Sequence, residues 1–347
     1  MPHVMQASHR VTIETDSNRT LSFKERVRRH FAKGHPKDDK VKYLTRAMFA
    51  FQAITQLYVS LKYLVPHIFQ DYDPWTQYYI KVGVCYLCIN AVVNWLCVML
   101  YDTSFRRTKD RPEYNVEAVC ENNPDHFVGR IANQDKNGNI PNSSQTDDWS
   151  SWVYCITCQM NIPPRAHHCD YCKKCIIKRD HHCFMVGTCI GFKNQRYFII
   201  LAFYSTIIGL LAGYFTGKYL YDVFVPTSCV SDFFLPVTFY RMLFGNIDLQ
   251  TFLLIYHSHL LVPMGCIASI YFVSQMIIVS QGVTLYEIAK KVDVKCTRPV
   301  NENFRSVFGD FWGLNFLFPA QIIFRQREDG KSWDGIKIMK RRKVAKS

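Results

Sequence analysis

Cysteine and histidine are concentrated in one short stretch of the chain, residues 155–189. Two cysteine pairs within it, Cys155–Cys158 and Cys169–Cys172, are separated by two residues. This spacing lets both sulfur atoms reach one metal ion from a tight turn. The stretch holds seven cysteines and four histidines: Cys155, Cys158, Cys169, Cys172, Cys175, Cys183, Cys189, His167, His168, His181 and His182. The pattern predicts zinc binding.

The number of ligands predicts two zinc sites. A structural zinc ion takes four ligands, so two sites need eight. His168 and Cys169 should serve different ions, because neighbouring residues of an extended segment point to opposite sides. This alternation predicts two interleaved Cys₃His sites, the first made by Cys155, Cys158, His168 and Cys175, and the second by Cys169, Cys172, His182 and Cys189.

Two residues of the sequence "DHHC" are then left without a metal ion, His181 and Cys183. They are two positions apart and can share the face opposite to His182, as a nucleophile and its base would. Asp180 can accept a hydrogen bond from one ring nitrogen of His181 and orient the ring, leaving the other nitrogen to take the thiol proton. The alternative is that both are bystanders in a purely structural zinc domain; the neighbouring carboxylate favours catalysis.

Apolar segments on either side of this stretch must place it at a membrane. Four of them approach or exceed the roughly 20 helical residues that cross a bilayer core; they are 47–65, 78–100, 197–221 and 252–280. Pro263 and Gly265 predict a kink in the last one. Four such segments in 347 residues favour membrane spans over buried helices of a soluble core.

The basic residues predict the orientation of these spans. Of the 42 Lys and Arg residues, 38 lie in the segments 1–46, 101–196 and 281–347, whereas 66–77 has none and 222–251 has only Arg241. Cytosolic segments carry the excess of Lys and Arg, so the charge indicates topology and does not indicate nucleic acid binding. Thiols on the cytosolic side stay reduced, which suits metal binding or catalysis.

The predicted fold is a polytopic α-helical membrane protein with four transmembrane helices and a cytosolic, cysteine-rich two-zinc domain of short β-hairpins between helices 2 and 3. The expected order is a cytosolic basic tail (1–46), the first span (47–65), a lumenal loop (66–77), the second span (78–100), a cytosolic polar linker (101–150), the zinc domain (151–196), the third span (197–221), a lumenal loop (222–251), the fourth span (252–280) and a cytosolic C-terminal tail (281–347).

Polar residues inside the predicted spans have simpler interpretations than metal binding. His257 and His259 look like a metal pair, but no third ligand lies near them in the sequence, which favours packed histidines. Asn90 and Asn94 lie four residues apart on one helix face. They predict hydrogen bonding between helices.

The segment from Cys155 to Phe198, including "GFKNQRYF", resembles the zinc-finger DHHC protein S-acyltransferases, or palmitoyltransferases. The resemblance implies a two-step reaction in which Cys183 takes a long-chain acyl group from acyl-CoA (palmitoyl-CoA) and passes it to a cysteine of a membrane-associated protein. It further implies an endomembrane location (endoplasmic reticulum or Golgi), with the active site facing the cytosol. Arg165 matches a family position near the CoA phosphates. Thr284 and Glu287 match the family's Thr-Thr-x-Glu motif, which supports the catalytic Asp.

The chain also departs from the family pattern. Phe184 and Met185 replace a Pro-Trp pair, Thr188 replaces an Asn, and Leu285 replaces the second Thr of the Thr-Thr-x-Glu motif. These differences leave a second hypothesis, a catalytically silent, zinc-folded membrane scaffold of the same family. The complete Asp180-His181-His182-Cys183 sequence favours the enzyme.

Overall fold

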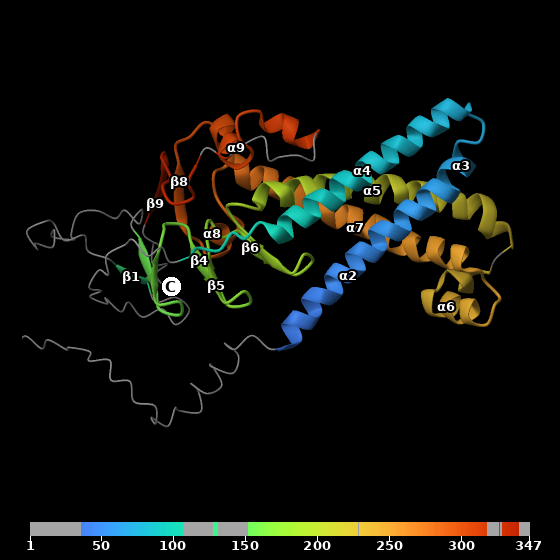
Figure 1. Cartoon of the computed structure of the whole chain (residues 1–347), viewed down its shortest axis with the longest axis horizontal. Helices are drawn as coiled ribbons and strands as arrows, with labels where there is room; N and C mark the ends of the chain where they lie inside the picture. Colours follow the sequence, from blue (N-terminus) through green and yellow to red (C-terminus); the bar gives the residue numbers. More distant parts are fainter. Residues whose placement is uncertain are drawn as a thin grey trace, which may run out of the picture.

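The structure, a computed structural model, describes residues 36–106, 128–130, 152–227, 229–317, 326 and 328–339. Long helices form one end of the molecule, and the small antiparallel sheets gather at the other (Figure 1). Most of the predicted tail 1–46 and of the predicted linker 101–150 lies outside the described residues.

Three described helices are long and apolar enough to cross a membrane. They are α4 (Pro74–Leu100), α5 (Gln195–Tyr219) with its π-helical continuation η2 (Leu220–Phe224), and α7 (Leu249–Ser280). They contain the predicted spans 78–100, 197–221 and 252–280. The side chain of Asp73 caps the first of these helices by accepting the N–H groups of Trp75 and Thr76, which is why α4 begins before the predicted span.

The predicted span 47–65 is also helical but more polar. It lies in α2 (Pro36–Val59), the π-helical turn η1 (Ser60–Leu64) and α3 (Val65–Ile68), and it does not reach the apolarity of the other three. One of its polar side chains points into the protein, since Gln52 Nε2 donates to Nδ1 of the fully buried His257 on α7 at 2.7 Å. His257 is therefore a packed residue, and neither it nor His259 belongs to a group of potential metal ligands among the described residues.

The two asparagines of α4 each make a hydrogen bond to the helix backbone. Asn90 Nδ2 donates to the carbonyl of Tyr86, and Asn94 Nδ2 donates to the carbonyl of Asn90. These two bonds lie within one helix, because a side chain four residues on reaches back to the preceding turn. Hydrogen bonding of the two residues between helices stays a prediction.

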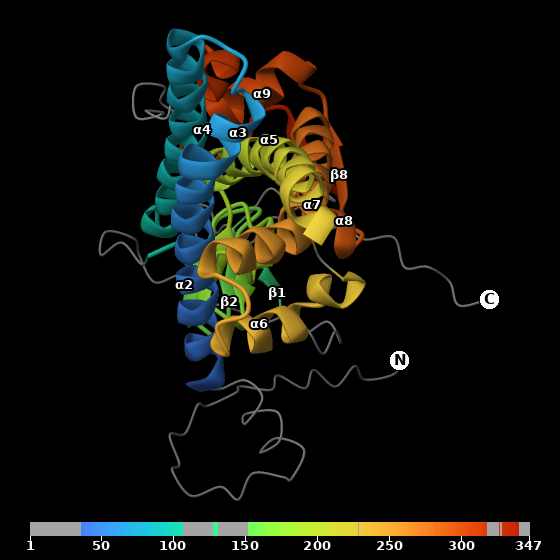
Figure 2. The same ribbon diagram turned by 90° about the vertical axis from the view of Figure 1, so that its right-hand side faces the viewer.

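Helices α5 and α7 touch through their backbones. A Cβ atom on Gly209 of α5 would lie 2.6 Å from Cα of Gly265 on α7, and one on Gly213 would lie 2.6 Å from the side chain of Val262. Small residues four apart let two membrane helices approach this closely. Figure 2 shows the two helices side by side, with α2 and α4 on the other side of the bundle.

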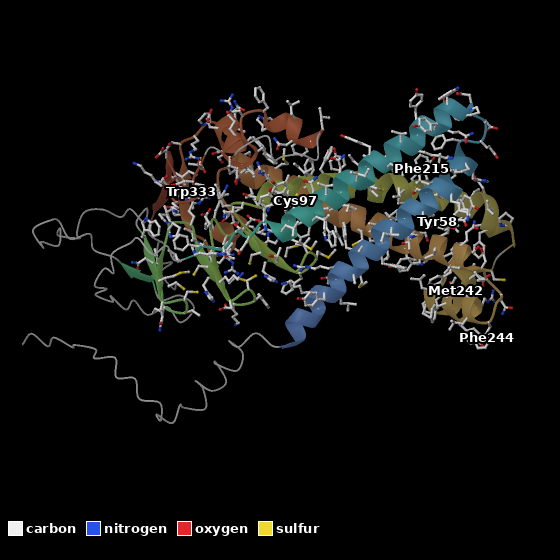
Figure 3. All side chains as sticks on the ribbon, viewed as in Figure 1. Tyr58, Cys97, Phe215, Met242, Phe244 and Trp333 are labelled. Atoms are coloured by element: carbon white, nitrogen blue, oxygen red, sulfur yellow. The ribbon has the colours of Figure 1, made fainter. Side chains whose placement is uncertain are left out.

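The predicted loop 222–251 contains short helices: η3 (Val225–Thr227), η4 (Val230–Phe233) and α6 (Leu235–Leu243). Arg241 of α6 forms an ion pair with Asp232. Figure 3 places Met242 and Phe244 at the end of the molecule opposite to the sheets.

Three small sheets between α4 and α5 are antiparallel, as predicted for a domain of short hairpins. Strands β1 (Val128–Arg130), β2 (Val153–Cys155) and β3 (Met160–Ile162) form the first, β4 (His167–Cys169) and β5 (Lys174–Ile176) the second, and β6 (His181–Cys183) and β7 (Thr188–Ile190) the third. The prediction of short β-hairpins is confirmed.

The C-terminal segment folds back over this sheet region. It comprises α8 (Leu285–Ala289), β8 (Asp293–Cys296), α9 (Val300–Phe308), the 3-10 helix η5 (Trp312–Phe316) and β9 (Ile336–Met339), which pairs with β8. Trp333 Nε1 donates to the carbonyl of Pro164 at 3.3 Å, and its position beside the hairpins is visible in Figure 3. Phe308 and Val307 join residues of α4 and α5 in one buried apolar cluster.

Candidate active site and metal clusters

The two hairpins that carry the histidines repeat the same arrangement. Each begins with the sequence His-His-Cys, at 167–169 and at 181–183. The register places His168 opposite Cys175 in one hairpin and His182 opposite Cys189 in the other. Each connecting turn has a residue of positive φ, Lys173 (54°) and Gly187 (63°). The middle histidine and the cysteine across from it therefore meet on one face of each hairpin.

The first cluster combines Cys155, Cys158, His168 and Cys175. Nδ1 of His168 lies 3.9, 3.2 and 3.9 Å from the sulfur atoms of Cys155, Cys158 and Cys175, respectively. Ligands at the corners of a zinc tetrahedron, with Zn–S about 2.3 Å and Zn–N about 2.0 Å, are separated by about 3.6 Å. These four residues fit a tetrahedral ion.

The second cluster combines Cys169, Cys172, His182 and Cys189. Nδ1 of His182 lies 3.8, 3.3 and 3.6 Å from the three sulfur atoms. Cys172 and Cys189 are 3.5 Å apart. The eight residues thus form the same two groups that the sequence predicts, and both groups have the size of a metal site.

Asp180, His181 and Cys183 lie together and outside both clusters. Nδ1 of His181 is 2.8 Å from Oδ2 of Asp180, and its other ring nitrogen, Nε2, is buried without a hydrogen bond. Cys183 is 5% exposed and packs in the apolar cluster made by α4 and α5. The thiol is therefore next to a histidine on one side and to apolar helices on the other.

The pKa values of His181 and Cys183 shift in the directions that favour an imidazolium and a thiolate. Burial opposes the imidazolium, but the bond and charge of Asp180 and the interaction with Cys183 outweigh it and raise the pKa of His181 to about 9. Burial likewise opposes the thiolate, yet His181 and the backbone N–H groups of Val186 and Met185 lower the pKa of Cys183. An activated thiolate beside an imidazolium is the form that attacks a carbonyl carbon.

The segment Thr284–Glu287, which follows α7, supports Asp180 through a main-chain N–H group. Oδ1 of Asp180 accepts the N–H of Leu285 at 2.8 Å. Thr284 and Glu287 form a capping box that fixes this N–H group at the start of α8: the Thr284 side chain accepts the N–H of Glu287, and Glu287 accepts the N–H of Thr284. Because the donor is a main-chain group, Leu285 makes this contact without a hydroxyl side chain.

Arg165 lies in a buried ion pair with Glu287. Its Nε and Nη2 atoms donate to the two carboxylate oxygens at 2.7 and 2.8 Å, and Nη2 also donates to the carbonyl of Gly282 at 2.9 Å. The Arg165 side chain is 0% exposed. Glu287 and Gly282 thus bind Nε and Nη2, whereas the buried Nη1 atom makes no hydrogen bond. The contact of Arg165 with CoA phosphates stays a prediction.

Phe184 and Met185, which follow the cysteine, point outward. They are 55% and 52% exposed. The Phe184 ring packs edge-on against Tyr171 and His182, with centroids 5.0 and 4.9 Å away. Neither side chain is buried, so these two departures change the surface beside the site.

Sequence reasoning missed the two glutamines behind Asp180, Gln275 of α7 and Gln195 of α5. Gln275 Nε2 donates to Oδ2 of Asp180 at 2.7 Å, and Gln195 Nε2 donates to Oε1 of Gln275 at 3.1 Å. A polar residue at position 275 inside an apolar span was the available indication, because such residues face the protein interior and mark functional sites.

Comparison with known protein families matches residues 150–292 to the family described as DHHC palmitoyltransferase. This range contains both clusters, Asp180, His181, Cys183, α5, α7 and the Thr284–Glu287 motif. This part of the chain is therefore similar to the DHHC palmitoyltransferases.

Individual family members show the same relationship. Palmitoyltransferase ZDHHC22 of Danio rerio is 32% identical over 175 residues, 49% of this chain and 58% of that protein. Probable palmitoyltransferase ZDHHC24 of Homo sapiens is 29% identical over 173 residues, 48% of this chain and 59% of that protein. Palmitoyltransferase PFA3 of Kluyveromyces lactis is 40% identical over 74 residues, 21% of this chain and 23% of that protein. The matches thus span less than two thirds of these DHHC relatives.

Proposed function

We propose that the protein is a protein-cysteine S-palmitoyltransferase that uses acyl-CoA, with Cys183 as the nucleophile, His181 as the general base and Asp180 as the group that orients His181. The observation that carries this proposal is the separation of Cys183 and His181 from both clusters. His181 is hydrogen-bonded to the buried carboxylate of Asp180, and Cys183 packs in an apolar cluster with residues of α4 and α5.

The reaction would proceed in two transfers. The Cys183 thiolate attacks the carbonyl carbon of the acyl-CoA thioester, the carbon–sulfur bond to CoA breaks, and the His181 imidazolium gives its proton to the departing CoA thiolate. In the second transfer, His181 takes the proton of a substrate cysteine. That thiolate attacks the carbonyl carbon of the acyl-enzyme, the carbon–sulfur bond to Cys183 breaks, and Cys183 leaves as a thiolate beside the His181 imidazolium. Asp180 stabilises the imidazolium in both transfers.

The two clusters would each hold a structural Zn²⁺ ion. Three sulfurs and one Nδ1 at tetrahedral separations form a closed site without an open position for substrate. Bound zinc supplies folding energy to small domains of this kind. The ions would hold the two hairpins in place, so that His181 and Cys183 face the helices.

We further propose four spans, with α2 crossing the membrane beside α7. The hydrogen bond between Gln52 and His257 turns a polar residue of α2 inward and leaves large apolar residues such as Phe51 and Ile54 exposed. Interhelical bonds of this type join helices within a bilayer. The positive-inside distribution then places the hairpin domain in the cytosol.

The partners follow from this chemistry. Acyl-CoA is the donor, and membrane-associated proteins with cytosolic cysteines are the acceptors. We place the protein in the endoplasmic reticulum or Golgi membrane, as the family resemblance implies. The apolar surroundings of Cys183 support an acyl chain that stays at the bilayer, because each exposed CH₂ group costs about 0.8 kcal/mol.

Acyl-CoA labelling of the purified membrane protein tests the proposal. Wild type should form a hydroxylamine-sensitive acyl-enzyme, and Cys183→Ser should not, while both keep their zinc. Cys229→Ser, at an exposed cysteine outside the clusters, is the matched control and should label like wild type. A zinc-loaded wild type that takes no label would show that the protein is a silent scaffold.

A further inference from the structure

Two buried glutamines connect the membrane helices to Asp180. Gln195 stands at the start of α5 and Gln275 lies in the last third of α7; each is 1% exposed, as is Asp180. The three side chains form a continuous series, with Gln195 Nε2 donating to Gln275 Oε1 at 3.1 Å and Gln275 Nε2 donating to Asp180 Oδ2 at 2.7 Å.

The oxygens of Asp180 depend on this series. Oδ1 is bound by the N–H of Leu285, and Oδ2 is shared by His181 Nδ1 and Gln275 Nε2. Gln275 is thus one of the three groups described here as donating to Asp180, and the other side-chain donor is His181 itself. A buried carboxylate that loses a donor still bears the free-energy cost of its desolvation. Its orientation is then less well fixed, and so is its hydrogen bond to His181.

Gln195 determines which way the Gln275 amide points. An amide group has one donor end and one acceptor end. The donor end of Gln195 occupies the oxygen of Gln275, which leaves the Gln275 nitrogen to face the carboxylate. The reversed amide would place its oxygen against Oδ2 of Asp180, where both atoms are acceptors.

We propose that Gln275, oriented by Gln195, is a positioning residue that holds Asp180 in the geometry that orients His181. The role rests on the proposed acyltransferase function and adds a residue of α7 to it. Together with the main-chain N–H of Leu285, Gln275 fixes the carboxylate without a hydroxyl side chain at position 285. The series joins α5 and α7 to Asp180.

The test measures acyl-enzyme formation on the full-length protein with palmitoyl-CoA. Gln275→Met keeps the size of the side chain and removes the donor. Loss of a hydrogen bond to a charged group should slow the step roughly 10- to 100-fold, with an unchanged KM for palmitoyl-CoA and unchanged zinc content. Gln52→Met is the matched control, because it removes another glutamine bond between helices, the one to His257, and should leave the rate unchanged.

A double variant separates positioning from general packing. If Gln195 acts through Gln275, Gln195→Met should slow the step in the wild-type background and add nothing in the Gln275→Met background. If the double variant is slowed by the full product of the two single effects, Gln195 does not act through Gln275 and the proposal is wrong. A Gln275→Met enzyme that acylates at the wild-type rate would also overturn it.

A second substitution covers the case in which Gln275→Met loses zinc or fails to fold. Gln275→Leu also removes the amide and offers no donor to Asp180, so it should slow acylation as much; a wild-type rate would refute the role. These outcomes differ from failure of the proposed function, in which wild type itself takes no label.

Discussion

His181 and His182 are neighbours in β6 with different surroundings. His182 points to the sulfur atoms of the second cluster, whereas His181 is bound to Asp180. Alternation along a strand produces this division, because successive side chains leave opposite faces. The same alternation separates His168 from Cys169 in β4, which belong to different clusters.

Substitution of each histidine should therefore have a different result. His181→Ala is expected to keep both metal ions and abolish acyl-enzyme formation. His182→Ala removes one of four ligands and should lower the zinc content by about one ion per chain. Elemental analysis of the purified variants, alongside acyl-CoA labelling, checks both. Loss of zinc from His181→Ala would contradict the division.

Helices α5 and α7 pack closely against each other where Gly209 faces Gly265. Any side chain on Gly209 must push the helices apart, since its Cβ would lie 2.6 Å from Cα of Gly265. Helix α5 follows the hairpin that carries His181, and α7 precedes α8, which carries the backbone support of Asp180. We therefore expect the glycine contact to stabilise the two helices from which these elements extend.

Gly209→Ala should destabilise the bundle by about 1–3 kcal/mol through overpacking. Gly217→Ala, in the same helix, is the control, because a Cβ at that position meets no atom within 4 Å. Thermal unfolding of the detergent-solubilised protein measures the difference. Equal melting temperatures for the two variants would argue against close packing at the crossing.

The turn before β4 is joined to α8 by the ion pair of Arg165 and Glu287. Both side chains are buried, with exposed fractions of 0% and 3%. The pair links residues 122 positions apart in the sequence. It thereby connects the hairpin domain to the capping box that presents the Leu285 N–H to Asp180.

Arg165→Met should cost about 3–5 kcal/mol, because it leaves a buried carboxylate unpaired. The double variant Arg165→Met/Glu287→Gln should recover part of that loss, since no charge then remains at the site. Unfolding midpoints of the four proteins in this cycle provide the measurement. If Arg165 instead binds CoA phosphates, the single variant will raise the KM for acyl-CoA and leave the midpoint unchanged.

The whole molecule combines a helical bundle with a domain that has little secondary structure of its own. Strands β2 to β7 contain three residues each, so few main-chain hydrogen bonds hold the hairpins. The bundle has a continuous buried cluster that includes Tyr197, Ile199 and Phe308. The two parts should differ in their dependence on metal.

Metal removal by a chelator should therefore unfold the hairpins and spare the helices. Hydrogen exchange is expected to rise over residues 152–190 and to stay slow in α4, α5 and α7. Restored zinc should return both the protection and acyl-enzyme formation. Hairpins that stay protected without metal would show that the clusters do not supply their folding energy.

The sequence by itself determined the features that depend on local spacing. Cysteines two residues apart, strand alternation and tight turns bring ligands together over short distances, so the two clusters have the predicted members. Three of the predicted spans were identifiable because their apolar residues are continuous. The first span was harder to identify from its apolarity, because its polar Gln52 is seen to point inward only when α2 lies against α7.

Only the tertiary structure decided what surrounds Asp180. Its donors Gln275 and Leu285 come from 95 and 105 positions away, and Leu285 contributes a backbone group that its side chain does not reveal. Arg165 likewise pairs with Glu287, 122 positions away in the sequence. Contacts over such separations depend on how the helices pack, and the sequence near each residue does not contain that information.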